Sequence, residues 1–205
     1  TRGWWYDIVA EDFDKDGDMD LVVGNLGNNY KYQTSGDETF DIFYNDFDQN
    51  NTGDIVLSYY NDGEQYPLRG RQCSSEQIPA IKMKFQDYDA FSIATLEDVY
   101  TEPALENSLH YFSKTFSSVY LENTGNSFNM SKLPPLTQLS SINKILKKDI
   151  DKDGYIDIVV SGNMYNSEVE TPRNDASVGV YLKFTPDFGF EAVPTQKLSL
   201  IHISE

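Results

Sequence analysis

The chain has 205 residues, and its 33 Asp and Glu against 16 Lys and Arg give it a formal net charge of −17. This acidity argues against nucleic acid as a partner, because phosphate binding needs a surplus of cationic side chains. It also argues against polybasic contact with anionic lipid. The 14 Tyr and 12 Phe supply enough apolar surface for one sizeable core or two small ones.

Cys73 is the only cysteine, so an intrachain disulfide and a cysteine-based zinc site are both excluded. No apolar run approaches the length of a membrane-spanning helix, and we therefore expect no membrane insertion.

One acidic motif occurs three times, at residues 12–20, 46–54 and 149–157. An apolar stretch precedes each copy, at residues 4–9, 40–44 and 142–146, and a short β-branched run follows it. This pattern predicts a tight loop between two strands in each case. A repeated unit of this kind indicates an array built from one supersecondary element.

The spacing within the motif fits a hard divalent cation such as Ca²⁺, which takes six to eight oxygen ligands. Positions 1, 3 and 5 supply side-chain oxygens, and glycine at position 6 permits a sharp reversal. Position 7 supplies its main-chain carbonyl, and position 9 returns a carboxylate. The predicted ligands are Asp12, Asp14, Asp16, Asp18 and Asp20; Asp46, Asp48, Asn50, Thr52 and Asp54; and Asp149, Asp151, Asp153, Tyr155 and Asp157.

The middle copy departs from the other two, with Asn50 at position 5 and Asn51 in place of glycine. Asparagine tolerates a left-handed backbone, but the ligand charge is lower. We therefore predict two Ca²⁺ sites, in the first and last loops, and leave open whether the middle loop binds a third ion. An EF-hand is rejected because position 12 is Val23 or Val160 instead of glutamate and the flanks are strands. Magnesium and zinc fit the ligands less well.

Elsewhere strand signals dominate, at residues 108–116, 118–122 and 178–184. The exception is a predicted helical insertion over residues 74–105, with a capping-box start at Ser74 and Gln77. The expected organisation is an all-β chain with strands over 1–73, the insertion, and strands again over 106–197.

The acidic motifs, each followed by a hydrophobic run, resemble the FG-GAP/VCBS repeat of integrin alpha subunits and bacterial surface proteins. Flanking phrases are similar to Bacteroidetes-type VCBS-repeat proteins that carry an ASPIC/UnbV module, like cartilage acidic protein. These phrases lie at residues 3–5, 66–71, 94–100 and 174–177. The resemblance implies a partial β-propeller of about three or four blades. It also implies an extracellular, cell-surface or periplasmic location.

The leading functional hypothesis is a non-catalytic module that binds a protein or glycan. His110 lies in an aromatic strand with no partner motif for a catalytic triad, which argues against hydrolase chemistry. A carbohydrate-active enzyme, using a carboxylate outside the loops such as Glu97 or Glu122, is the alternative. A third hypothesis is that the chain is an architectural spacer in a larger surface protein.

The chain reads as a piece of a longer polypeptide, beginning within a predicted strand. Residues 198–205 resemble a reading frame of a transposase-type sequencing adapter, so we interpret them as read-through and exclude His202 from any site. The three loops hold twelve of the 33 acidic residues. Three Ca²⁺ ions, with two charges each, would bring the net charge from −17 to −11.

Overall fold

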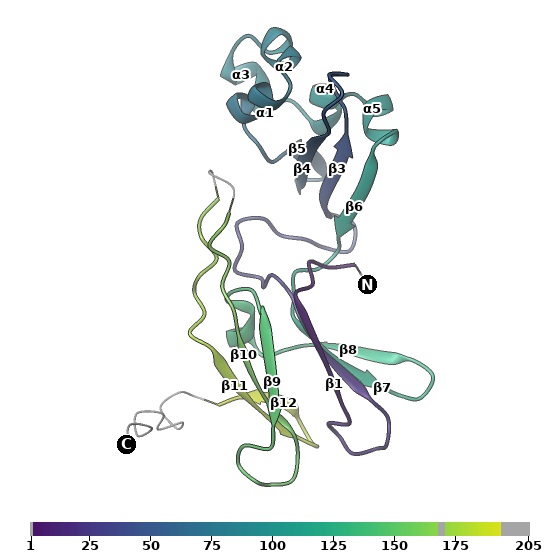
Figure 1. The fold of residues 1–205 in the computed structure, drawn as a ribbon, viewed down its shortest axis with the longest axis vertical. Helices are drawn as coiled ribbons and strands as arrows, with labels where there is room; N and C mark the ends of the chain where they lie inside the picture. Colours follow the sequence, from purple (N-terminus) through teal and green to yellow (C-terminus); the bar gives the residue numbers. More distant parts are fainter. Residues whose placement is uncertain (1, 168–170, 194–205) are drawn as a thin grey trace. The chain divides into compact units, whose positions relative to one another are not determined.

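The computed structural model describes residues 2–167 and 171–193, which are mostly β-structure with a few short helices (Figure 1). The chain forms two compact units. The two-sheet unit comprises residues 4–31 together with the chain from 116 onward, and the helical unit comprises residues 32–115 with the N-terminal residues up to Gly3. The helical unit therefore interrupts the sequence of the two-sheet unit.

The two-sheet unit contains two four-stranded antiparallel sheets. The first has the order β1-β2-β7-β8 and consists of Asp7–Glu11, Asp20–Gly24, Val119–Asn123 and Phe128–Lys132. The second has the order β12-β11-β10-β9 and consists of Gly189–Ala192, Val180–Thr185, Asp157–Ser161 and Lys144–Lys148. Each sheet is an up-and-down meander in chain order, and the helical unit enters the first one between β2 and β7. A 3₁₀ helix, Pro135–Gln138, lies between the two sheets in the sequence.

The core of the two-sheet unit draws apolar side chains from both sheets, including Val22, Ile158 and Leu182. Phe13, at position 2 of the first acidic loop, is fully buried and meets the ring of Phe190 edge-on at 5.0 Å. Burial of a phenylalanine contributes roughly 2–3 kcal/mol. The first loop is therefore attached to the core by one of its own side chains.

The packing of this unit explains the Gly-Asn pair at the end of β2, Gly24 and Asn25. A Cβ on Gly24 would lie 2.4 Å from the carbonyl oxygen of Ile142, so only glycine fits there. The side-chain amide of Asn25 is fully buried and donates to the carbonyl of Ser117 at 3.2 Å. After β10 the same pair recurs, and Asn163 bonds both main-chain polar groups of Ser177 at 3.0 Å. In each sheet the asparagine ties the end of the second strand to the segment leading into the third.

The helical unit contains one four-stranded antiparallel sheet in the order β5-β4-β3-β6. Its strands are Glu64–Pro67, Asp54–Asn61, Phe40–Asn45 and Leu109–Ser113. Five short helices follow β5 in the sequence, α1 to α5, at Arg71–Gln77, Ala80–Lys84, Tyr88–Ser92, Leu96–Tyr100 and Glu102–Glu106. Apolar side chains of these helices, such as Leu96 and Val99, pack with Phe43 and Val56 of the sheet.

The predicted helical start at Ser74 is wrong. Helix α1 begins at Arg71 with Gly70 as its N-cap, so Ser74 lies within the helix, where its hydroxyl donates to the carbonyl of Arg69. A capping box does form at α4, where Thr95 accepts the N–H of Asp98 at 3.2 Å and the Asp98 carboxylate accepts the N–H of Thr95 at 2.9 Å. The Ser-x-x-Gln pattern does not cap a helix here, because α1 begins three residues before Ser74.

The expected predominance of β-structure is confirmed by the three sheets. The helices fall between Arg71 and Glu106, close to the expected 74–105 segment. The two compact units, however, cut across the expected segments, because residues 1–73 are divided between them. The interpretation of residues 198–205 lies outside the described residues. In the described part of the chain no helix has the length and apolar character needed to cross a bilayer.

Candidate metal centres

Each acidic loop connects the two strands of a hairpin, which confirms the predicted placement. The first loop joins β1 to β2, the middle loop joins β3 to β4, and the third joins β9 to β10. The residue before the motif pairs with position 9 in all three hairpins, as Glu11 with Asp20, Asn45 with Asp54 and Lys148 with Asp157. The hairpins therefore hold the three motifs in the same register.

The backbone of the loops is also the same. Position 4 has a positive φ in each copy, at 65°, 59° and 62° for Lys15, Gln49 and Lys152. Position 6 has a positive φ as well, at 97° and 92° for Gly17 and Gly154. Asn51 takes this conformation with φ of 66° in the middle loop, as expected for an asparagine in the left-handed region. Loss of the glycine therefore does not change the course of the middle loop.

Four hydrogen bonds from main-chain N–H groups to Asp or Asn side chains recur in all three copies. Position 6 donates to position 1, position 5 to position 3, position 7 to position 5, and position 2 to position 9. In the first loop the donors are Gly17, Asp16, Asp18 and Phe13, in the middle loop Asn51, Asn50, Thr52 and Phe47, and in the third loop Gly154, Asp153, Tyr155 and Ile150. These bonds fix the side chains at positions 1, 3 and 5 on the inside of the turn.

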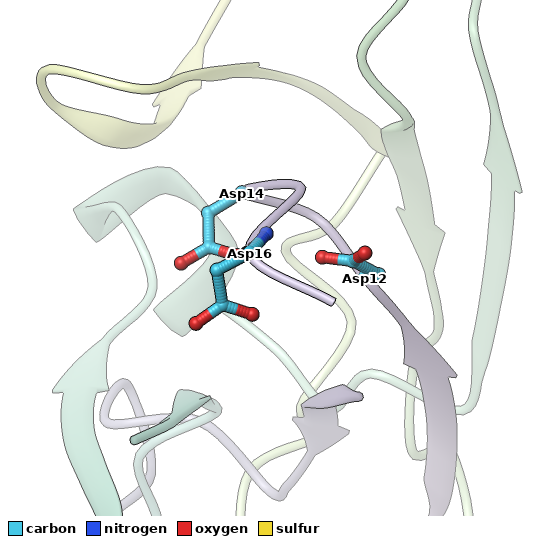
Figure 2. A group of neighbouring side chains, drawn as sticks. All are labelled: Asp12, Asp14 and Asp16. Carbon is cyan, nitrogen blue, oxygen red and sulfur yellow. Dashed lines mark hydrogen bonds between the residues drawn. The ribbon is translucent and has the colours of Figure 1, made fainter. Parts of the chain in front are cut away.

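The first loop gathers Asp12, Asp14 and Asp16, each with a carboxylate oxygen within 4.8 Å of the others (Figure 2). The third loop gathers Asp149, Asp151 and Asp153 in the same way. Oδ1 of Asp12 and Oδ1 of Asp149 are both buried, and within the described part of the chain neither accepts a hydrogen bond. An uncompensated buried carboxylate oxygen is costly, and a cation bound among the three carboxylates would supply the missing partner. The donor set, all oxygen and mostly charged, fits Ca²⁺.

The middle loop differs at its first residue. Oδ1 of Asp46 accepts the N–H of Asn50 at 2.9 Å, and Oδ2 accepts the N–H of Asn51 at 2.8 Å. Both oxygens of this carboxylate therefore have protein donors. The acidic group here consists of Asp46, Asp48 and Asp54, because position 5 is an asparagine. The middle loop thus has a lower negative charge and lacks the unsatisfied oxygen of the other two.

Position 9 has a distinct environment in the first and third loops. Asp20 is fully buried, and it accepts the hydroxyl of Tyr120 at 2.7 Å and the N–H of Asn123 at 2.8 Å. Asp157 is likewise buried, and it accepts the hydroxyl of Tyr181 at 2.8 Å and the N–H of Phe184 at 3.1 Å. With the bond from position 2, each carboxylate has three protein donors. These aspartates join the loop to the third strand of the sheet, and they are not among the clustered triads.

The tyrosines that meet these aspartates have raised pKa values, first because burial disfavours the phenolate and then because each hydroxyl is bonded to a carboxylate. Both hydroxyls therefore stay protonated donors. Asp54 has no such partner: it accepts the N–H of Phe47 at 2.9 Å, and the described residues place no tyrosine hydroxyl on it.

Carboxylates within the loops also show perturbed pKa values. The pKa of Asp14 is raised, mainly by burial, with further contributions from the charges of Asp20, Asp16 and Asp12. Burial and the charges of Asp48 and Asp46 raise the pKa of Asp54. Crowded carboxylates that resist ionisation are expected where a cation is to be bound. The pKa of Asp153 is instead lowered by its bond with Lys183.

Lys183 of β11 was not recognised from the sequence. Its ammonium group bonds the carboxylates of Asp151 and Asp153, at 2.8 Å in the latter case. The tyrosine anchors were also missed, although the sequence carried a signal for them. The tripeptide Val-Tyr-Leu occurs at residues 119–121 and 180–182, in the third strand of each sheet of the two-sheet unit.

His110 lies outside the acidic loops. Its Nε2 lies 2.6 Å from Oδ1 of the buried Asp41, and its ring stacks on Phe43 at 4.2 Å. This is the environment of a paired histidine within a sheet. The two carboxylates considered for glycoside hydrolysis occupy different units, Glu97 in α4 and Glu122 in β7.

Comparisons with protein-family models, curated proteins and solved structures found no match to this chain.

Proposed function

We propose that the chain is a Ca²⁺-binding β-sheet module in which the first and third acidic loops each hold one ion. The observation that carries this proposal is the buried, unpartnered Oδ1 at position 1 of both loops, within a triad of carboxylates. The residues that would hold the ions are Asp12, Asp14 and Asp16, and Asp149, Asp151 and Asp153. The bound ion would neutralise carboxylates that otherwise repel one another.

The role proposed for the metal is structural. Each triad lies in a hairpin loop whose position 9 carboxylate is already bonded within the loop and to the third strand. A catalytic metal would need an open coordination position and a base beside it. The ion would instead fix the hairpin, and through position 9 the third strand of the same sheet.

The wider architecture proposed is that of β-propeller blades of the FG-GAP/VCBS type. Four-stranded antiparallel meanders with a calcium loop in the first hairpin are consistent with such blades. In this proposal the module is located outside the cytoplasm, where calcium is abundant, and it binds a protein or glycan without catalysing a reaction. Two bound ions, with two charges each, would bring the net charge from −17 to −13, which favours a cationic or neutral partner surface over an acidic one.

The test is calorimetric titration with Ca²⁺, combined with thermal melting in Ca²⁺ and in chelator. We expect two binding events and a higher melting temperature with Ca²⁺, because a ligand that binds only the folded state stabilises it by about 2.7 kcal/mol at a hundredfold excess over Kd. Asp12→Asn and Asp149→Asn should each remove one binding event, because each replaces the charged carboxylate that contains the unpartnered oxygen by a neutral amide. Asp187→Asn, in the exposed turn between β11 and β12, is the matched control. Identical melts in Ca²⁺ and chelator would refute the proposal.

A further inference from the structure

The first and third loops have the same backbone and the same triad, but a lysine distinguishes them. Lys183 extends from β11 to the third loop and pairs with both Asp151 and Asp153. Among the described residues no ammonium or guanidinium group pairs with Asp12, Asp14 or Asp16. Lys15, which belongs to the first loop, instead places its ammonium 4.2 Å from the centre of the Tyr155 ring.

The two sheets of this unit show which position Lys183 occupies. Tyr120 and Tyr181 bond the position 9 aspartates of their loops, and the residues three further on, Asn123 and Phe184, donate their N–H groups to the same aspartates. The residue two positions after the tyrosine therefore occupies an equivalent place in both sheets. It is Glu122 in the first sheet and Lys183 in the second, so the charge at this position is reversed.

A cation that enters the third loop must compete with this ammonium group. It would have to break two ion pairs, and Lys183, held by its strand, would then remain near a divalent charge and be repelled by it. In the first sheet the equivalent residue is Glu122, whose Oε2 accepts the side-chain amide of Asn129 at 3.4 Å. A negative charge at this position attracts a cation where Lys183 repels one. Both ion pairs are partly exposed and therefore screened by solvent and salt, so a modest difference of about tenfold in Kd is expected.

We propose that Lys183 is an affinity-determining residue that makes the third loop a weaker Ca²⁺ site than the first. Lys183 acts as a built-in competitor for the third triad, and Glu122 supports the first. The two sites therefore fill in order as calcium rises, the first loop before the third. This inference rests on the proposed function, because it presumes that both loops bind the ion.

The experiment measures each loop separately by calorimetry with Ca²⁺ at about 0.15 M salt. The first background leaves only the third loop intact and carries Asp14→Asn, Asp16→Asn and Asp48→Asn. The second background leaves only the first loop intact and carries Asp48→Asn, Asp151→Asn and Asp153→Asn. In the first background Lys183→Met, which retains the aliphatic stem, should tighten binding about tenfold, and Lys183→Glu should tighten it further. In the second background Glu122→Lys should weaken binding by a similar factor. Lys144→Met is the control, because Lys144 pairs with Asp7 at the opposite end of β9.

Circular dichroism in chelator verifies that each variant keeps its β-structure. Binding at both loops with equal Kd, unchanged within twofold by Lys183→Met and Glu122→Lys, would overturn the inference and leave the proposed function intact. Absence of Ca²⁺ binding at either loop in every variant, up to about 10 mM, would overturn the proposed function and this inference together. A third loop that binds only after Lys183→Met would support the inference in its strongest form.

Discussion

Tyr120 donates its hydroxyl hydrogen to the buried carboxylate of Asp20 across 2.7 Å. The bond joins β7, the third strand of its sheet, to the last residue of the first acidic motif. The second sheet repeats it with Tyr181 and Asp157 at 2.8 Å. A carboxylate buried in this way is tolerated because three protein donors bond it, so the loop and the strand form a single hydrogen-bonded unit.

Removal of the tyrosine hydroxyl should therefore destabilise the fold without any change in apolar burial. We expect Tyr120→Phe and Tyr181→Phe each to lower the free energy of unfolding by about 2 kcal/mol, the usual effect of losing a hydrogen bond to a charged group. Urea denaturation followed by circular dichroism measures this difference. Tyr111→Phe, at an exposed position of β6, should change it by less than about 0.5 kcal/mol. Equal effects at all three positions would contradict the anchoring role.

The positive φ at position 6 predicts a specific cost of a side chain there. Gly17 has φ of 97°, and a Cβ at this position would meet no atom within 4 Å. Gly17→Ala should therefore destabilise by about 1 kcal/mol through backbone strain alone. Gly36 also has open space around it but no positive φ, so Gly36→Ala is the matched control and should be neutral or slightly stabilising. Thermal melts in chelator compare the two; a Gly17→Ala melt no lower than that of Gly36→Ala would disprove the strain.

The capping box of α4 predicts a pH-dependent contribution to stability. The N–H and hydroxyl of Thr95 lower the pKa of Asp98, so the folded state prefers the charged form. The contribution is fully present above the ordinary carboxyl pKa of about 3.9 and is lost as the pH falls through the lower folded pKa. We expect Asp98→Asn to destabilise at pH 7 but to differ little from the parent near pH 2. Thr95→Ala should cost about 1 kcal/mol at pH 7.

Urea denaturation at a series of pH values gives this comparison directly. The exposed Asp89→Asn in α3 controls for the general effect of removing one negative charge. A destabilisation by Asp98→Asn that is the same at pH 2 and pH 7 would show that the Asp98 carboxylate has no part in the cap.

The first loop predicts the opposite pH dependence for the metal-free protein. The pKa of Asp14 is raised by burial and by neighbouring carboxylates, so over that range the folded state binds more protons than the unfolded state. Metal-free stability should then fall as the pH rises through this range. Calcium reverses the effect, because the ion binds the ionised carboxylates. The increase in melting temperature on adding Ca²⁺ should be largest near pH 7 and should vanish near pH 4, and an increase independent of pH would argue that the ion binds elsewhere.

Local sequence was sufficient for the loops because their information is local. The alternating carboxylates, the glycine at position 6 and the flanking β-branched runs fix a turn within nine residues, and Asn51 could be recognised as a tolerable substitute for the same reason. The helical segment was found from its spacing, although its start at Ser74 was misplaced. A capping pattern does not indicate whether a helix has already begun upstream, and Thr95 with Asp98 was the pair that capped one.

The sequence by itself determined that this chain is acidic, rich in strands and built around three copies of one loop. It could not determine what surrounds each loop, because those contacts come from strands 24 to 100 residues away in the sequence. Tyr120 lies 100 residues from Asp20, and Lys183 lies 32 residues from Asp151. Only the tertiary structure decided that position 9 joins the third strand, that Oδ1 of Asp12 and Asp149 lacks a partner, and that one triad faces a lysine. Charge and hydrogen bonding act through space, so loops of nearly identical sequence acquire different electrostatic environments when the strands beside them carry Glu122 in one sheet and Lys183 in the other.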